Sequence, residues 1–187
     1  MPTYPLTAVV LRKTKLGETD LILTMLGADG ALYRAVAKGA RKPGSKFGGR
    51  GEPATVLDLL IAKGRTLDVI SDARIRCSHA VLREDYDLVH TTSALLDFAA
   101  TVSQEGLDEP DLYDLTGKAL DALESCTGNP ARGERYLLAY LIKAAALCGF
   151  HSGLDPTAAD FATVHRFLNE NIPARLKGFE YYATMRP

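Results

Sequence analysis

The stretch DLILTMLGADGALYRAVAK, residues 20–38, contains two short apolar runs separated by a turn. The first run spans 20–26, the tetrapeptide Gly27-Ala-Asp-Gly30 is a turn signal, and the second run spans 31–38. Because β-rich runs that flank a glycine-containing turn are typical of a hairpin, we expect two paired strands here. This hairpin sets the pattern for the first eighty residues.

Further short runs lie on both sides of this hairpin. Residues 5–12 are β-rich and are followed by Gly17, which breaks the pattern. A segment rich in glycine, proline and basic residues, 39–53, is predicted to be a loop. Strands are expected after it at 55–62, 66–70 and 73–76. About five short strands with no helical run between them predict a small closed barrel.

After Cys77 the apolar residues recur with helical spacing. We expect a first helix with one apolar face, formed by Leu88, Thr92, Leu95, Ala99 and Val102. Three more helices are predicted to start at Pro110, at Asn129-Pro130 and at Asp155-Pro156, because proline is favoured in a first helical turn. Gly149 and Ile172-Pro173 are the expected stops of the last two. Four helices with short connections predict a bundle, so the fold class is α+β.

The charge is divided between the two halves of the chain. Residues 1–80 carry 13 Lys and Arg against 7 Asp and Glu, a balance of +6, whereas residues 81–187 carry 9 against 16, a balance of −7. This asymmetry indicates that the first half contacts a polyanion. The sequence has no apolar run of membrane-spanning length and no secretion-signal pattern, and its three cysteines are widely spaced. These features predict a cytoplasmic protein without a disulfide framework.

The strongest local signal is a basic cluster between Asp29 and Glu52, which no acidic residue interrupts. Arg34 and Lys38 lie four residues apart on the expected strand 31–38, so we expect them to point to the same face. Clustered cations bind phosphates, and aromatic rings can stack on single-stranded bases. A solvated loop that serves solubility is the alternative interpretation. The candidate DNA-binding residues are Arg12, Lys13, Arg34, Lys38, Arg41, Lys42, Lys46 and Arg50, with the aromatic residues Tyr33 and Phe47.

Other chemistries fit the sequence less well. The segment 39–46 resembles a phosphate-binding P-loop, but Ser45 precedes Lys46 and a loop rather than a helix is expected to follow. Cys148 and His151 have a metal-ligand spacing, with His165 further on, but a structural zinc site normally needs four ligands. No nucleophile and base are paired in a recognisable way. We therefore expect no enzymatic activity, no cofactor and no metal.

Three segments resemble the RecO family of recombination mediators. They are VVLR followed by GETD at 9–20, AKGARKP with SKF at 37–47, and GRTL leading into ISDA at 64–73. Their order and spacing agree over roughly residues 4–76, whereas the helical part is similar only in general character. The family usually has an acidic residue after this last alanine, where the chain has Arg74.

The resemblance implies an OB-fold at 1–78 followed by an α-helical domain at 79–187. It implies binding of single- and double-stranded DNA, annealing of complementary strands, and partnership with RecR and single-stranded-DNA-binding protein to load RecA. The acidic, hydrophobic tail of single-stranded-DNA-binding protein would contact cations of the helical domain, for which Arg132, Arg135 and Lys143 are candidates. Many family members carry a CxxC-type zinc module after the segment that matches residues 147–155, and we expect it to be lost or shortened here, because 156–159 contains no cysteine.

The sequence thus predicts a DNA repair protein that binds and anneals DNA. Two alternatives remain open at this point: an RNA-binding OB-fold protein, and a protein–protein adaptor that does not bind nucleic acid. The first would depend on the 2′-hydroxyl of its ligand, and the second would show no salt-dependent DNA binding.

Overall fold

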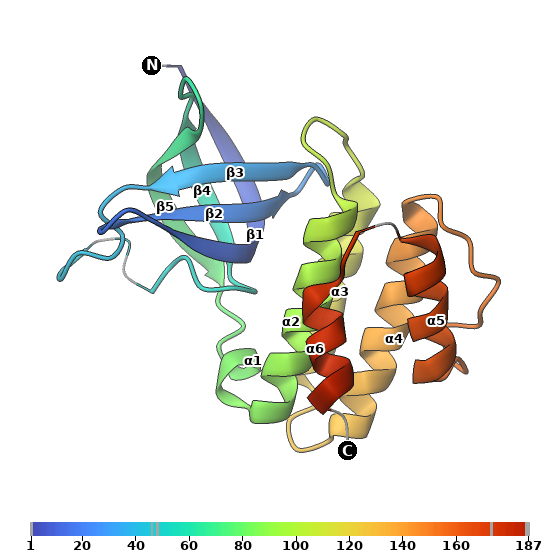
Figure 1. The fold of residues 1–187 in the computed structure, drawn as a ribbon. Helices are drawn as coiled ribbons and strands as arrows, with labels where there is room; N and C mark the ends of the chain where they lie inside the picture. Colours follow the sequence, from blue (N-terminus) through green and yellow to red (C-terminus); the bar gives the residue numbers. More distant parts are fainter. Residues whose placement is uncertain (1, 46, 48, 173, 186–187) are drawn as a thin grey trace. The chain divides into compact units, whose positions relative to one another are not determined.

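A computed structural model describes residues 2–45, 47, 49–172 and 174–185 (Figure 1). The chain divides into two compact units. The barrel unit comprises Met1–Ser78 together with Ser103–Tyr113, and the helical unit comprises His79–Val102 and Asp114–Pro187. Within the described residues, no helix is both long enough and apolar enough to cross a membrane.

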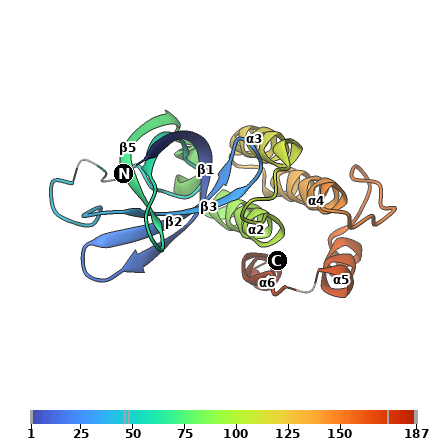
Figure 2. The same cartoon turned by 90° about the horizontal axis from the view of Figure 1, so that it is seen from above.

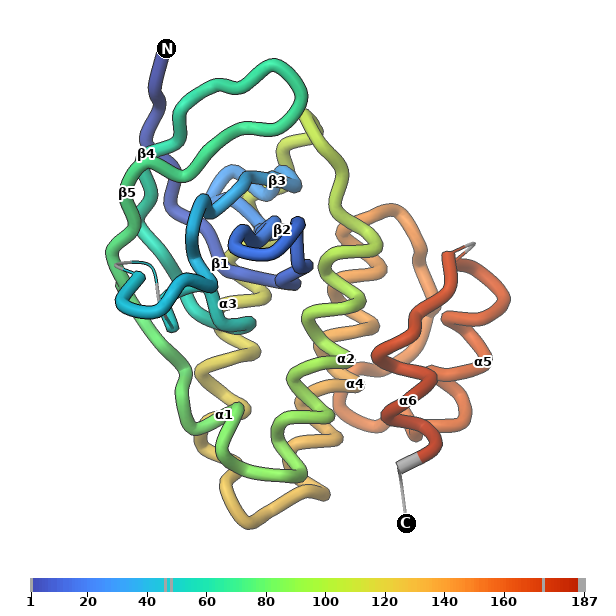
Figure 3. The backbone as a smooth tube through the Cα atoms, turned by 60° about the vertical axis from the view of Figure 1, so that its left-hand side comes forward, coloured from blue at the N-terminus to red at the C-terminus, as the bar shows by residue number. Residues whose placement is uncertain are grey.

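Five strands form a closed barrel in the order β1-β2-β3-β5-β4. The strands are β1 (Thr3–Leu16), β2 (Asp20–Gly27), β3 (Leu32–Ala37), β4 (Val56–Ala62) and β5 (Asp68–Cys77). All neighbouring pairs are antiparallel except β3 and β5, which run parallel. Figure 3 traces the path of the backbone through the five strands. This architecture confirms the OB-fold expected from the sequence.

Every second residue of the strands points into the barrel, and these side chains fill its interior. Leu6, Ala8 and Val10 of β1 point inward and are buried together with residues of all the other strands. A register shift between Val10 and Arg12 interrupts the alternation in the middle of β1. Beyond this β-bulge, β1 continues to Leu16 with exposed residues only, paired with β2. The long hairpin therefore extends past the core of the barrel.

The predicted strands are confirmed, with two corrections at their ends. The runs expected at 66–70 and 73–76 form a single strand, β5, in which the pairing with β4 skips Ser71. A β-bulge allows the strand to continue where the sequence pattern breaks. The expected strand at 31–38 ends at Ala37, and Lys38 lies in a turn. Arg34 and Lys38 therefore do not share a strand face.

The segment 103–113, which the sequence places in the helical domain, packs with the barrel unit. The Leu32 N–H at the start of β3 donates to the Gln104 carbonyl at 3.0 Å. Gly30, with a φ of +83°, lies so close to Glu109 that a Cβ built on it would be 1.9 Å from the Glu109 carbonyl oxygen. Only glycine allows this approach.

The helical unit has α2 (Tyr86–Val102) packed against α4 (Pro130–Leu147) and α6 (Lys177–Met185) (Figure 2). The remaining helices are α1 (Val81–Glu84), α3 (Pro110–Glu124) and α5 (Phe161–Asn171), of which α3 begins in the barrel unit. The predicted starts at Pro110 and Pro130 are confirmed, as is the stop at Gly149, whose φ is +88°.

The prediction for the last helix is wrong in two respects. Asp155 and Pro156 form a turn, in which the Asp155 carboxylate accepts a bond from the Thr157 N–H at 2.8 Å. The helix begins instead at Phe161, where the Asp160 carboxylate accepts from the Thr163 N–H at 2.9 Å. A further helix, α6, was not predicted; its Phe179 is buried beside Phe161 of α5, and its Gly178 N–H donates to Asp97 of α2 at 2.8 Å.

Candidate nucleic-acid interface

The candidate interface begins with a row of outward side chains across three strands. Arg12 of β1 pairs with Thr24 of β2, which in turn pairs with Arg34 of β3. Both arginines are exposed, whereas the next row contains Leu23 and Ala35, which point into the core. We call Arg12, Thr24 and Arg34 the outer row. It places two arginines on the outside of the barrel, two strands apart, so that their Cα atoms are roughly 10 Å from each other by ordinary strand spacing.

A second group of cations surrounds a hollow of about 290 Å³ at one end of the barrel. Lys13 and Lys15 alternate on β1 and share a face, and Arg41 joins them from the loop after β3. The Lys13 ammonium forms an ion pair with Glu52 at 2.5 Å. We call this site the basic hollow; its other lining residues are Leu21, Ala40, Phe47, Gly49 and Gly51. It concentrates three cations around an apolar floor with one acid.

Asp20 connects the beginning of the loop 38–55 to the β1–β2 hairpin through hydrogen bonds. Its carboxylate accepts hydrogen bonds from the Gly39 N–H at 2.7 Å and from the Thr19 hydroxyl at 2.9 Å. The bond from Gly39 is the main reason why the pKa of Asp20 is held below its usual value, with help from the nearby charges of Lys38 and Lys42. The Arg41 N–H also donates to the Thr19 carbonyl at 2.9 Å. The exposed side chains of Lys38, Arg41 and Lys42 are thus brought beside the hairpin.

The two predicted aromatic residues are placed apart and play different structural roles. Phe47 packs against the barrel core, and a Cβ added to Gly51 would lie 2.7 Å from its ring. Tyr33 lies on β3, and its hydroxyl donates to Asp29 at 2.5 Å. Desolvation and this hydrogen bond raise the pKa of Tyr33 to about 12. Each ring is half-buried, so each shows only part of its surface to solvent.

Among the remaining predicted cations of the barrel, Arg50 is less exposed than those described above. Arg50 is half-buried, and its guanidinium donates to the Ala73 carbonyl at 3.3 Å. Lys46 lies outside the described residues. Lys15, which lines the basic hollow, was not among the predicted residues. Its alternation with Lys13 on one strand was the signal that could have identified it.

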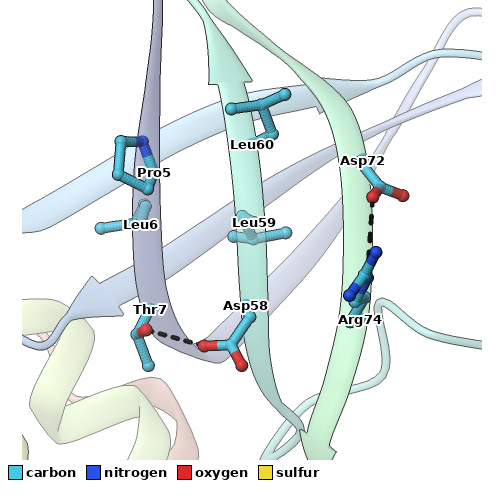
Figure 4. Close-up of a pocket in the computed structure, with 8 residues that line it drawn as sticks. All are labelled: Pro5, Leu6, Thr7, Asp58, Leu59, Leu60, Asp72 and Arg74. Carbon is cyan, nitrogen blue, oxygen red and sulfur yellow. Dashed lines mark hydrogen bonds and ion pairs between the residues drawn. The ribbon is translucent and has the colours of Figure 1, made fainter.

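A further hollow of about 510 Å³ lies over β1, β4 and β5 and has a different character (Figure 4). Thr7 donates to Asp58 at 2.7 Å, and Asp72 lies 3.9 Å from Arg74. The bonds from Thr7 and then from Arg76 hold the pKa of Asp58 below its usual value, so it is an anion at neutral pH. Its lining sets two carboxylates, Asp58 and Asp72, against the single cation Arg74, so it is a poor site for phosphate.

The structure brings the three partner-binding candidates of the helical unit onto α4. Arg132, Arg135 and Lys143 are all exposed, and helical geometry places them within about 80° of one another around the helix axis. The Arg132 guanidinium also lies over the Tyr136 ring, 5.6 Å from its centroid, and donates to its hydroxyl at 3.2 Å. They form a basic strip along one side of this helix.

The other chemistries considered from the sequence gain no support. In the part of the chain that the structure describes, no three His, Cys, Asp or Glu side chains gather as a metal site. The described residues of the P-loop-like segment form turns and are not followed by a helix. Cys77, Cys126 and Cys148 are not joined in a disulfide.

Comparison with known proteins assigns the family. Residues 1–78, which include the five strands of the barrel, match the family described as "Recombination protein O N terminal". The chain belongs to the RecO family. The RecO protein of Cutibacterium acnes, "DNA repair protein RecO", is 39% identical over 155 residues, which cover 80% of this chain and 62% of that protein. Those of Synechococcus elongatus and Frankia casuarinae are 39% and 35% identical over 126 and 159 residues.

The similarity to these RecO proteins continues past the barrel. It covers 67% of this chain for the Synechococcus protein and 84% for the Frankia protein. The chain itself spans about half to two thirds of their length, 47% and 65% respectively. The shared part thus includes the barrel and helices that follow it.

Proposed function

We propose that this chain binds single- and double-stranded DNA through the barrel unit and acts in recombinational DNA repair. The observation that carries the proposal is the concentration of cations on β1, β3 and the loop after β3, in which Arg12 and Arg34 point outward and Lys13 and Lys15 face the basic hollow. The outer row and the basic hollow both use β1, so five cationic side chains, those of Arg12, Arg34, Lys13, Lys15 and Arg41, lie on adjoining strands and the loop. In OB-folds this is the side on which oligonucleotides commonly bind. The name carried by the curated relatives, DNA repair protein RecO, supports the same role.

Strand annealing follows from this kind of surface. Two complementary strands repel each other through their phosphates, and neutralising both accelerates their encounter. Contacts made mainly to phosphate leave the base edges free to pair. The cations of the interface project from strands and a turn-rich loop, whereas the candidate aromatic rings are half-buried, which favours phosphate contact over base stacking. We infer that the protein promotes annealing by binding alone, without catalysing a reaction.

The proposed partners follow the family. We infer that the chain acts with RecR and single-stranded-DNA-binding protein and so helps to load RecA. The basic strip of α4, with Arg132, Arg135 and Lys143, supports the second of these interactions because an acidic peptide needs exposed cations.

A salt titration of DNA binding tests the proposal. Binding of a labelled single-stranded oligonucleotide is measured by fluorescence anisotropy from low to physiological salt. With several phosphates contacted, log K should fall with log salt at a slope of roughly −2 to −4, about −0.7 for each phosphate. A slope near zero would refute the electrostatic interface and favour an adaptor role. An RNA of the same sequence that bound much more tightly would favour an RNA-binding role.

A further inference from the structure

A third hollow, of about 520 Å³, lies beside the outer row and includes Arg34 in its lining. Its walls come from β3, from the β4–β5 turn and from the segment 103–107, all within the barrel unit. The rings of Tyr4 and Tyr33 lie 6.4 Å apart in it, and the ammonium group of Lys63 lies 5.9 Å from the centroid of the Tyr4 ring. We call it the tyrosine hollow; its other lining residues are Leu32, Arg34, Thr66, Leu67, Asp68, Glu105 and Gly106.

Arg34 belongs to both the outer row and the tyrosine hollow. Its guanidinium Nε donates to Glu105 Oε1 at 2.7 Å. The side chains of Arg34 and Glu105 are 52% and 57% exposed, so the pair is accessible to solvent and to a ligand. A carboxylate oxygen here occupies the position that a phosphate oxygen would take on the same guanidinium.

The backbone holds Glu105 in this place. The strand β3 pairs with β5 only at Ala35 and Val36, so β5 does not cover the beginning of β3. At this uncovered edge of β3, the Leu32 N–H donates a hydrogen bond to the Gln104 carbonyl. A turn follows Gln104, and in it the Leu107 N–H donates to the same carbonyl at 3.4 Å. Gly106 makes the turn possible with a φ of +73°.

We propose that the tyrosine hollow is a subsite for one nucleotide of single-stranded DNA, and that Glu105 competes with its backbone phosphate for Arg34. This inference rests on the proposed function and assigns one contact within it. The phosphate replaces the carboxylate on Arg34, with Lys63 as the second cation of the lining, and Leu32, Leu67 and the tyrosine rings provide apolar surface for the sugar or base. The second carboxylate of the lining, Asp68, already accepts bonds from the Tyr4 hydroxyl at 2.6 Å and the Gly64 N–H at 3.0 Å. Glu105 thereby lowers affinity at this subsite until a strand displaces it.

The test compares three variants of the full chain by anisotropy with a labelled oligonucleotide at low salt. Glu105→Gln keeps the shape of the side chain and removes its charge. It should increase affinity about two- to five-fold, the range expected from an exposed ion pair. Arg34→Ala should weaken binding, and Glu105→Gln combined with Arg34→Ala should show no increase over Arg34→Ala alone.

A matched control separates the local contact from net charge. Asp108→Asn removes the same charge from an exposed residue of the same segment. If Asp108→Asn strengthens binding as much as Glu105→Gln, or if the gain persists without Arg34, the competition at Arg34 is refuted while DNA binding stands. If neither the natural protein nor Glu105→Gln shows salt-dependent binding, both the subsite and the proposed function fail. A gain that is specific to Glu105, depends on Arg34 and fades as salt rises supports the subsite.

Discussion

At the scale of single residues, Asp20 links the two parts of the candidate interface. Its carboxylate accepts from the Gly39 N–H at the start of the loop while the residue itself begins β2. Its hydrogen bonds are made to the ionised form, which is why its pKa lies below the usual value. The charge of this side chain therefore contributes to the stability of the folded state.

The pH dependence of stability tests this role. Because the pKa is lower in the folded state than the unfolded value of about 3.9, the contribution is complete above that pH and is lost as the pH falls through the folded-state pKa. Asp20→Asn should therefore lower the melting temperature slightly at pH 7, and the difference from the natural protein should shrink progressively below about pH 4. Calorimetry across this range measures it. Glu18→Gln, in the same turn, should leave the melting temperature unchanged, and a pH-independent effect of Asp20→Asn would contradict the role of the charge.

At the scale of the elements, the loop 38–55 is the part of the candidate interface that we expect to contribute most to DNA binding. Its exposed cations Lys38, Arg41 and Lys42 contribute no apolar contacts to the barrel core. Replacing all three with Glu should leave the fold intact, as judged by circular dichroism. It should slow annealing by roughly tenfold or more, because association that depends on charge steering changes by one to three orders of magnitude.

The control for the loop variant lies in the helical unit. Lys118, Arg166 and Lys177 are also exposed, and reversing them changes the net charge of the chain by the same amount. This second variant should anneal DNA close to the natural rate. Equal loss in both variants, or a folded loop variant with the natural rate, would show that the position of the loop cations is unimportant.

At the scale of the whole molecule, we expect the opposite charge balances of the two parts of the chain to favour different partners. The first eighty residues carry +6 and the rest carry −7, so phosphate is attracted to the first part and repelled by the second. Replacing Arg132, Arg135 and Lys143 of α4 with Ala should weaken binding of an acidic, hydrophobic peptide about tenfold or more, since several charge-assisted bonds are removed. Isothermal titration calorimetry with the full chain measures this.

The specificity of the peptide interaction has its own controls. The same α4 variant should bind single-stranded DNA as the natural protein does, because its changes lie outside the barrel unit. Peptide binding that survives in the α4 variant but disappears when Lys38, Arg41 and Lys42 are reversed would place the peptide on the barrel instead.

Much of the fold could be predicted because it depends on local patterns. Short alternating runs and glycine turns predicted the strands, and the first-turn prolines at Pro110 and Pro130 predicted two helix starts. Asp155-Pro156 carries the same signal but forms a turn, since the competing cap at Asp160 is followed by a better amphipathic segment that buries Val164 and Leu168. Local sequence signals indicate possible helix starts, and the burial of apolar side chains determines which of them is used.

Three sequence segments were enough to predict the RecO resemblance, and short-range periodicity and composition were enough to predict the barrel followed by helices and the concentration of cations in the first half. Which cations lie together could be seen only in the folded chain. Strand register aligned Arg12 with Arg34, although 22 residues separate them, and loop closure brought Arg41 to Lys13 and Lys15. The pairing of Arg34 with Glu105 spans 71 positions. Such contacts depend on which strand edges and turns stay exposed after the core has packed, and a local sequence pattern cannot predict this.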